Sequence, residues 1–530
     1  MPSDMVDIAG SGHRVTEITS HRKSGIDAQI AAAIAALAAL AAGWAVIASR
    51  QIFPFGSINH DEAVYRLQAD TLVHGHLFPV APPHPAAFLP WLSAYRSGRF
   101  IPKYAPVHAS LLALGRLLTG TDRAGLGLIA AAAVVVTALL AHEVLEDWGL
   151  AVLAAALLLL SPLFLLQSAT YLTYTTGLVL LEAFALCVFR ATSTRRCCWC
   201  VAAGFAAGLA FFARSYDAVL FGIPLAAYVV FEGWGELRAL ARRSCWYTLG
   251  AIPPLAALLA FNRAATGNSL RSPFGLLDAS DSIGFGNHRI YPTDPYLHFT
   301  PREGLLGVVR QLSLTGFWCF GGLVLIGLAG WALWGQDRHS KRVWLAAAGL
   351  MIPIGYFFFW GDYGSTIFGL PRYLGPFYYL PTLAPIVVLG AAGCGRLWRA
   401  DRLVAGIAAV AMVGLSAFVA GRTIRTDARL SADDRRLNQG LADAHLDHAL
   451  VFLPELAGPE LLIPFGTALN HYGYSGRVVY ALDQGPQADA VVAADFPDRR
   501  PYLLVVSGTY RAQPPDPALT SRLEPLPAPS

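Results

Sequence analysis

Two neighbouring carboxylates, Asp61 and Glu62, stand near the start of the polar segment NHDEAVYRLQADTLVHGHLFP, residues 59–79. A positioned carboxylate can take a proton from an attacking hydroxyl, which is general-base chemistry. Acidic residues also favour the first turn of a helix, where they meet free amides and the positive end of the helix dipole. In an isolated soluble segment capping would be the preferred interpretation, so the surroundings of the pair decide between the two.

Cations and tyrosines stand at three other places in the chain. Lys103 and Tyr104 precede a short apolar segment, Arg214 lies where two apolar segments meet, and Arg372 and Tyr373 belong to GLPRYLGP. Lysine and arginine form charge-assisted hydrogen bonds with phosphate oxygens. A site for a lipid phosphodiester needs such cations near the membrane surface and a carboxylate beyond them. These residue types therefore fit chemistry on a phosphorylated lipid, provided that all of them lie on one side of a membrane.

Composition indicates that the chain is a polytopic α-helical membrane protein. Of its residues 55% are hydrophobic and 14% are charged, and the mean hydropathy is +0.48. An average soluble domain has about 25% charged residues. Uncharged runs recur that are each about long enough to cross a hydrocarbon core of about 30 Å; the clearest are residues 30–49, 148–181, 343–361, 374–395 and 403–421.

Five basic clusters indicate which ends of these spans face the cytoplasm. They lie at residues 21–23, 190–196, 238–243, 338–342 and 396–402, and basic residues are enriched in cytoplasmic loops. Successive clusters must be separated by an even number of crossings. Residues 105–118 are too short for an ordinary span and contain Arg116, so we expect them not to cross. This parity predicts about 11 spans, plus or minus one.

The same topology divides the chain into three parts. Residues 1–27 are predicted to be a cytoplasmic tail, followed by a signal anchor, and residues 28–421 form the transmembrane module. Loops 50–104 and 263–305 then lie outside, on the same face as the carboxylate pair and the cations. From residue 422 the composition becomes charged and rich in proline, with strand-like runs at 449–454, 477–483 and 502–506. We therefore expect residues 422–530 to form a small extracytoplasmic α/β domain.

Other polar residues receive structural interpretations. The run CCWC at 197–200 has the wrong spacing for a zinc site and no histidine partner. The first-loop histidines His60, His74, His76 and His84 are interpreted as polar loop residues, and Asp278, Asp281 and Asp362 as solvated loop residues. Glu182 lies inside a span, where we expect it to bond a neighbouring helix. The basic residues flank spans, and no nucleotide-binding loop is present, so neither nucleic acid nor ATP is an expected partner.

Four short motifs, in this order, resemble the GT-C glycosyltransferase superfamily. They are the Asp61-Glu62 pair in a long first outer loop, Gly-His-Leu at 75–77, Tyr-Ala-Pro at 104–106 opening a short helix, and Pro-Arg-Tyr at 371–373. The resemblance covers residues 28–421. The nearest relatives it implies are bacterial enzymes similar to protein mannosyltransferases, of glycosyltransferase family 39, and to aminoarabinose transferases.

The resemblance also implies roles for individual residues. Asp61 would be the catalytic base, with Glu62 assisting or orienting it. Lys103 and Arg372 would bind the donor phosphate. The pocket would be shaped by a set of polar and aromatic side chains: His60, Tyr104, Tyr373 and Arg214. No metal ligand is assigned, although some members of the superfamily use a divalent cation, for which Asp61 would then be a ligand.

The implied activity is inverting transfer of a hexosyl or pentosyl unit from a polyprenyl-phosphate sugar. The acceptor would be an envelope glycan, lipid or protein on the extracytoplasmic face of the bacterial plasma membrane. A lipid-linked polymer ligase or polymerase would have its large loop late in the chain, with Arg and His pairs. A transporter would have polar or broken spans in inverted repeats. A non-catalytic scaffold would leave Asp61 expendable.

The topology can be tested by cysteine labelling. Because residues 105–118 are predicted not to cross, single cysteines placed near both ends of this segment should react with an impermeant reagent added from outside. A cysteine at position 120 that reacts only from the cytoplasm would contradict the predicted topology.

Overall fold

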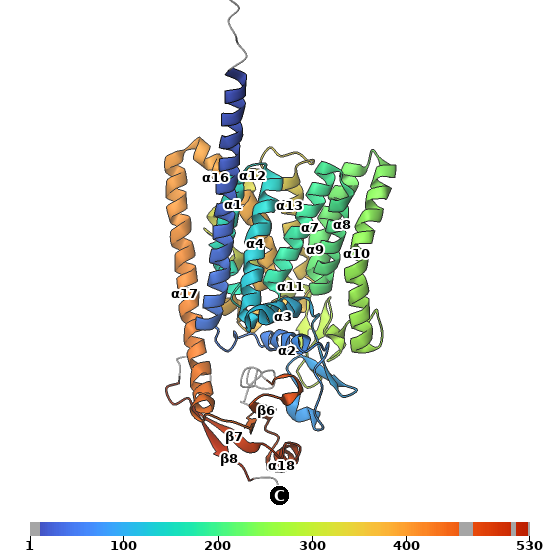
Figure 1. The fold of residues 1–530 in the computed structure, drawn as a ribbon, viewed down its shortest axis with the longest axis vertical. Helices are drawn as coiled ribbons and strands as arrows, with labels where there is room; N and C mark the ends of the chain where they lie inside the picture. Colours follow the sequence, from blue (N-terminus) through green and yellow to red (C-terminus); the bar gives the residue numbers. More distant parts are fainter. Residues whose placement is uncertain (1–10, 455–469, 510–515, 528–530) are drawn as a thin grey trace, which may run out of the picture.

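The computed structural model describes residues 11–454, 470–509 and 516–527. Long helices run side by side in a bundle, two short helices lie across its lower end, and a small sheet domain lies beyond them (Figure 1). In order, the helices of the bundle's first half are α1 (Ser11–Gln51), α2 (Asp61–Val73), α3 (Val107–Thr119), α4 (Asp122–Leu145), α5 (Trp148–Leu159), α6 (Pro162–Gln167), α7 (Tyr174–Thr194), α8 (Cys197–Ala213), α9 (Ser215–Gly233) and α10 (Leu237–Thr266).

The second half of the bundle contains more broken elements. Its helices are α11 (Pro301–Trp318), α12 (Leu323–Leu333), α13 (Lys341–Tyr356), α14 (Trp360–Ile367), α15 (Leu370–Leu374), α16 (Leu383–Ala400) and α17 (Arg402–Asp443). Two hairpins lie in the connecting loops, β1 (Ser93–Arg96) with β2 (Arg99–Pro102) and β3 (Gly286–His288) with β4 (Leu297–Phe299). Short 3₁₀ helices are η1 (Pro85–Phe88), η2 (Pro273–Gly275), η3 (Phe377–Thr382) and η5 (Tyr472–Tyr474).

The lengths and compositions of these helices are those of a membrane protein. Within the described residues, seven helices are long and apolar enough to cross a membrane, or up to nine if each of two bent pairs is one span. The bent pairs are α11 with α12, at 97°, and α13 with α14, at 73°. The predicted count of 11 would also need α5 and α8, which are shorter, and is not confirmed. The segment predicted not to cross is α3, a separate helix of 13 residues.

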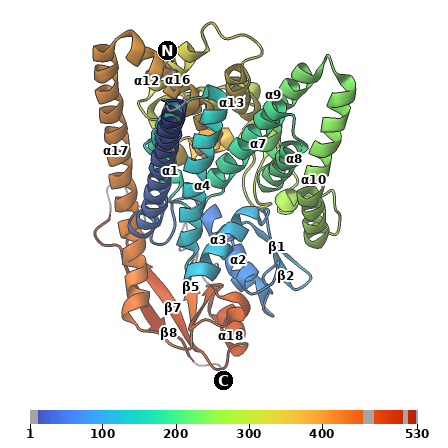
Figure 2. The same ribbon diagram turned by 45° about the horizontal axis from the view of Figure 1, so that its top comes forward.

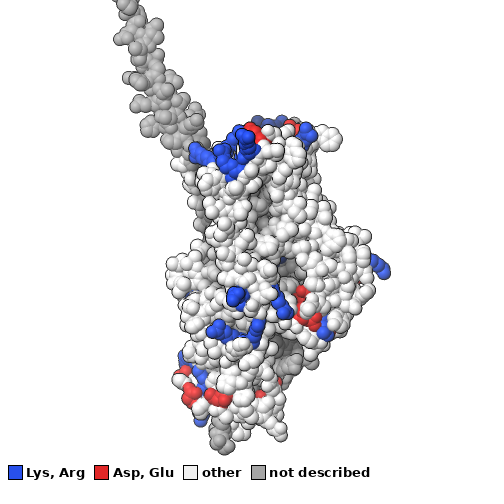
Figure 3. Space-filling view, turned by 90° about the vertical axis from the view of Figure 1, so that its right-hand side faces the viewer, with Lys and Arg blue, Asp and Glu red and all other residues white. Residues whose placement is uncertain are grey.

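The basic clusters of the described bundle meet at one end. Glu143 bonds Arg190 at 3.1 Å and Lys341 at 2.6 Å, so loops far apart in sequence converge there. Arg195 pairs with Glu236 at 3.5 Å. Figure 3 shows basic residues at the end from which α1 projects, followed by a mostly uncharged band. The short helices α2 and α3 lie at the opposite end (Figure 1), so the predicted separation of the two ends is confirmed.

Inside the bundle, the carboxylate of Glu182 is fully buried on α7. The Thr137 hydroxyl of α4 donates to both of its oxygens, at 2.9 and 2.8 Å. A buried carboxyl group in a span is costly unless a neighbour satisfies it. The prediction that Glu182 bonds an adjacent helix is therefore confirmed.

Glycine allows α3 to rest directly on α4. A Cβ added at Gly115 would lie 2.1 Å from the backbone nitrogen of Gly125, and one added at Gly125 would lie 2.7 Å from the Leu111 carbonyl oxygen. Small residues are the usual means of close backbone approach between membrane helices. Two further contacts hold α2: Arg116 of α3 pairs with Asp70 at 2.7 Å, and Gln68 donates to the carbonyl of Tyr104, just before α3, at 2.8 Å.

The C-terminal domain is the predicted small α/β unit. Its sheet has the order β6-β5-β7-β8, with β5 parallel to β6 and β7 and antiparallel pairing between β7 and β8. The elements are β5 (Ala449–Leu453), β6 (Val478–Leu482), α18 (Pro486–Ala494), β7 (Arg500–Ser507) and β8 (Thr520–Pro525). The three predicted strands are confirmed. The boundary expected at residue 422 differs, because α17 continues from the last apolar segment to Asp443 without a break.

This domain packs against the first loop of the transmembrane module. Figure 2 shows it directly below α2 and α3. Phe88 and Phe100 of the loop share a hydrophobic core with Leu450 and Phe452 of the sheet. The interpretation of three histidines as plain loop residues is thereby corrected: these are His74 and His76, whose rings stack on Tyr472, and His84, which bonds Asp495 at 2.5 Å.

The glycine contact between α3 and α4 gives a stability prediction. Gly125→Ala should destabilise the protein by about 1–3 kcal/mol, because the added methyl group meets backbone that has no room to yield. Gly43→Ala is the matched control, since a Cβ there has nothing within 4 Å and alanine is the better helix former. Thermal unfolding of both variants in detergent is the measurement. Equal melting temperatures would mean that the close approach of α3 and α4 does not contribute to stability.

Candidate active site

Asp61 is the first residue of α2, but its side chain bonds other side chains. Its Oδ2 accepts a hydrogen bond from the Tyr104 hydroxyl at 2.7 Å, and its Oδ1 accepts one from Trp91 Nε1 at 3.5 Å. The Asp61 backbone N–H donates to the Asn59 side chain at 3.0 Å, so this N–H group at the start of α2 is bonded by Asn59. The arrangement favours a functional carboxylate over a helix cap.

Aromatic rings surround this carboxylate. Tyr104 stacks on Tyr65, with ring centroids 5.1 Å apart and planes at 14°. Trp91 lies between His60 and Tyr291, with centroid distances of 5.9 and 5.3 Å. Tyr65 follows Asp61 by four residues on α2, and such neighbours share one face of a helix. Asp61 is therefore a partly buried carboxylate in an aromatic pocket.

The pocket makes Asp61 a stronger base than an exposed aspartate. Burial raises its pKa above the ordinary value, while the Tyr104 hydrogen bond and the charge of Lys103 act in the opposite direction. Burial also raises the pKa of the Tyr104 hydroxyl well above its usual range, and the negative charge of Asp61 adds to this. Tyr104 therefore stays protonated and continues to donate to Asp61.

Glu62 faces away from these partners. It is fully buried, and its carboxylate accepts hydrogen bonds from the Ser57 hydroxyl and from the backbone N–H groups of Ser57, at 3.2 Å, and Tyr171, at 3.1 Å. Burial raises its pKa to about 7. These contacts anchor α2 to the segment before it and to the loop before α7. Glu62 thus fits the orienting role implied for it.

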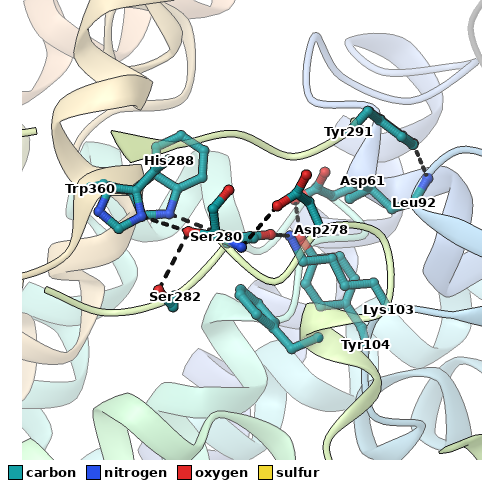
Figure 4. Close-up of polar contacts among 12 residues, drawn as sticks. Asp61, Leu92, Lys103, Tyr104, Asp278, Ser280, Ser282, His288, Tyr291 and Trp360 are labelled. Atoms are coloured by element: carbon teal, nitrogen blue, oxygen red, sulfur yellow. Dashed lines mark hydrogen bonds and ion pairs between the residues drawn. The ribbon is translucent and has the colours of Figure 1, made fainter. Parts of the chain in front are cut away.

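Lys103 lies next to the carboxylate but already has an anionic partner. Its ammonium pairs with Asp281 and lies 4.1 Å from the centroid of the Phe274 ring. Asp281 also accepts from Trp360 Nε1 at 3.3 Å. Figure 4 shows Asp61, Lys103 and Tyr104 meeting the loop that carries Asp278 and Ser280.

The interpretation of two of the three aspartates as solvated loop residues is corrected by this arrangement, whereas Asp278 is partly exposed. Asp281 and Asp362 are buried, at 5% and 1% exposure. Asp278 pairs with Arg289 at 2.6 Å. A single sequence does not show which loop aspartates fold inward, because that depends on partners far along the chain.

The second cation near the aromatic pocket is Arg214. It pairs with Asp217, donates to the Tyr356 hydroxyl at 3.1 Å and lies 4.2 Å from the Tyr174 ring centroid. Burial raises the pKa of the Tyr65 hydroxyl, the charge of Asp61 raises it further, and the charge of Arg214 lowers it. The charges of Asp61 and Arg214 therefore act on the Tyr65 hydroxyl in opposite directions.

The Arg372-Tyr373 pair has a different setting. Arg372 is exposed on α15, with its guanidinium 5.7 Å from the ring centroid of Tyr373, which is buried. Of the two arginines predicted from sequence, Arg214 is the one whose charge acts on the pocket tyrosines. Arg372 as a phosphate ligand stays a prediction.

The described residues do not assemble the ligands of a metal ion. Among them no group of three or more His, Cys, Asp or Glu side chains is arranged to hold one, and all seven cysteines are free. Protein-bound divalent cations take several oxygen or nitrogen ligands.

Three contributors to the site were missed in the sequence. Tyr65 could have been found, because a residue four positions after Asp61 lies on the same face of a helix. Trp91 and Asp281 carried no such signal, since each reaches the site from a loop.

Comparisons with known proteins concern the fold and one segment of the chain. Residues 103–261 match the family of dolichyl-phosphate-mannose-protein mannosyltransferases, and residues 449–529 match a domain family of unknown function. No curated protein matches the chain significantly. ArnT from Cupriavidus metallidurans bound to undecaprenyl phosphate has a similar fold, with a TM-score of 0.55 at 12% identity over 91% of this chain and 93% of that one.

The apo state of the same ArnT gives a TM-score of 0.57 at 13% identity, covering 95% of this chain and 98% of that one. The similarity therefore extends over the bundle and the C-terminal domain together. The chain has the fold of the GT-C membrane glycosyltransferases, as the order of its short motifs predicted, and residues 103–261 match the mannosyltransferase family.

Proposed function

We propose that this protein is a glycosyltransferase that uses a polyprenyl-phosphate sugar as donor. It transfers one monosaccharide, with inversion, to an envelope glycan, lipid or protein on the extracytoplasmic face of the membrane. The observation that carries the proposal is the Asp61 carboxylate held by Tyr104 and Trp91 beside Lys103. The similar fold of ArnT bound to undecaprenyl phosphate supports the donor class.

The chemistry requires one base and a place for the leaving phosphate. Asp61 takes the proton of the acceptor hydroxyl as that oxygen attacks the anomeric carbon. The bond between the anomeric carbon and the phosphate oxygen breaks, and the electron pair leaves with the lipid phosphate. Because a phosphate has a low pKa, it leaves without a general acid. Lys103 and Arg214 offset the negative charge on the departing phosphate.

The orientation of Glu62 argues for inversion. A retaining enzyme of the two-carboxylate kind needs a second carboxylate about 5 Å from the first, directed at the same sugar. Glu62 is instead bonded to Ser57 and Tyr171 in the protein interior. Because Glu62 is turned into the interior, the Asp61-Glu62 pair offers one carboxylate to the sugar, which supports direct displacement with the acceptor attacking from the face opposite the phosphate.

A substitution at Asp61 separates an enzyme from a transporter or a scaffold. Asp61→Asn preserves shape but removes the basic oxygen, so the transfer rate should fall about 10² to 10⁴-fold. Binding of the lipid-phosphate donor should survive, because the cations are intact. The measurement is transfer of radiolabelled sugar from lipid donor to acceptor by the purified protein.

Glu62→Gln is the matched control for Asp61→Asn. Glutamine has only one acceptor oxygen for the bonds that Glu62 receives from Ser57 and Tyr171. This variant should therefore lose thermal stability while keeping more of the transfer rate. Near-normal transfer by Asp61→Asn would remove Asp61 as the base, and an inactive but stable Glu62→Gln variant would move the base to Glu62.

A further prediction concerns the pH dependence of the transfer rate. Asp61 acts as a base only when ionised, so the rate should fall as the pH drops through its pKa, which burial raises above the ordinary aspartate value. The Tyr104 hydrogen bond lowers that pKa. Tyr104→Phe should therefore raise it and move the acid limb of the pH–rate profile to higher pH. Tyr95→Phe, at an exposed tyrosine, is the control. An unchanged acid limb in Tyr104→Phe would mean that Asp61 does not set it.

A further inference from the structure

The positive charge of Lys103 is already neutralised in the structure. Its side chain is 5% exposed and that of Asp281 is 2% exposed, so the ion pair is buried. Arg214, the other cation near the pocket, is paired in the same way with Asp217. A donor phosphate would meet cations that are already paired, with the Asp281 carboxylate bound to the ammonium that the phosphate needs.

The cation of a buried ion pair binds a second anion only if the first anion leaves it. An unpaired charge in a low-dielectric site is costly, so Lys103 must exchange one anion for another without an unpaired intermediate stage. The phosphate and the Asp281 carboxylate both offer oxygen acceptors to the ammonium. They are therefore competitors for Lys103.

Asp281 belongs to a compact loop that holds itself together. The His288 ring nitrogens lie 2.7 Å from the Ser280 carbonyl oxygen and 2.9 Å from that of Gly284. Loop residues 278–288 thus fold around the buried His288 ring and lead into the β3–β4 hairpin.

The loop is fastened to the bundle near Trp360. His288 stacks on the Trp360 ring, at 5.6 Å between centroids and 5° between planes, and Trp360 Nε1 donates to Asp281 at 3.3 Å. The Gly284 backbone N–H also donates to the Phe358 carbonyl at 2.9 Å. Figure 4 shows the His288 and Trp360 rings side by side at the edge of the cluster.

We propose that Asp281 holds the place of the donor phosphate on Lys103, and that residues 278–288 form a lid which donor binding displaces. This inference rests on the proposed function, since it takes Lys103 to be a phosphate ligand. Lys103 remains paired throughout, first with the carboxylate and then with the phosphate. A neutral lipid brings no anion to exchange and leaves the lid closed, so the lid selects phosphorylated lipids.

The experiment is a titration of the full-length protein in detergent with undecaprenyl phosphate, with undecaprenol as the neutral control. Asp281→Asn removes the competing charge and should lower the Kd about tenfold or more, because a bond to a charged group is freed for the ligand. Trp360→Phe keeps an aromatic ring but removes the N–H that donates to Asp281. The Kd of this variant for undecaprenyl phosphate should therefore also fall, by a smaller factor. If Asp281 instead supports Lys103 in binding the phosphate, both variants should bind more weakly, which would overturn the proposal.

Two further variants separate the lid from the proposed function. Lys103→Met should weaken phosphate binding, and adding Asp281→Asn to it should not restore the wild-type Kd, because the cation for which Asp281 and the phosphate compete is then absent. Asp447→Asn, in an exposed ion pair with Arg477 of the C-terminal domain, is the control and should change the Kd by less than about twofold.

The outcomes are distinguishable. Unchanged binding by Lys103→Met would remove Lys103 from the donor site and overturn the proposed phosphate contact. Weakened binding by Lys103→Met without tightening by Asp281→Asn would leave the donor site intact and overturn the lid alone. Undecaprenol binding as tight as undecaprenyl phosphate would overturn the selection of anionic lipids.

Discussion

The hydrogen bond from Tyr104 to Asp61 joins the two elements on which the site depends. Asp61 opens α2, and Tyr104 stands just before α3. Each helix is fixed separately: Glu62 anchors α2 through Ser57 and Tyr171, and a glycine contact seats α3 on α4. The distance between base and tyrosine is therefore set by the packing of the bundle's end. A shift of either helix would alter the basicity of Asp61, because the hydrogen bond lowers its pKa.

Around this bond the buried charges are arranged in pairs. Lys103 is matched by Asp281 and Arg214 by Asp217. In a site of low dielectric constant, such pairing is what makes the charges tolerable before substrate arrives. Asp61 has instead the hydroxyl of Tyr104 and the indole of Trp91. Neutral donors leave a carboxylate able to accept a proton, whereas a direct ion pair would hold it ionised and weaken it as a base.

Sequence predicted those features that repeat along the chain or follow from local spacing. Long apolar runs predicted most of the long helices, basic clusters predicted their common end, and short strand-like runs predicted β5, β6 and β7. Features that depend on distant partners were not predicted from the sequence. Asp281 is paired with a lysine in another loop, and the exposure of Arg372 is set by how α15 packs. The end of α17 was not predicted for another reason: its sequence turns polar at residue 422, but the backbone stays helical to Asp443.

The C-terminal domain is connected to the same helix that carries the base. Asp70, two turns and a half along α2 from Asp61, accepts the Tyr472 backbone N–H at 2.8 Å and pairs with Arg116 of α3. Burial alone would raise the pKa of Asp70, but the bonds from His471 and Tyr472, with the charge of Arg116, hold it below its ordinary value. The ionised carboxylate is thus favoured when the domain is docked. Asp70 on α2 bonds both the C-terminal domain and α3. Undocking of the domain would therefore loosen the packing of α2 and shift the position of Asp61.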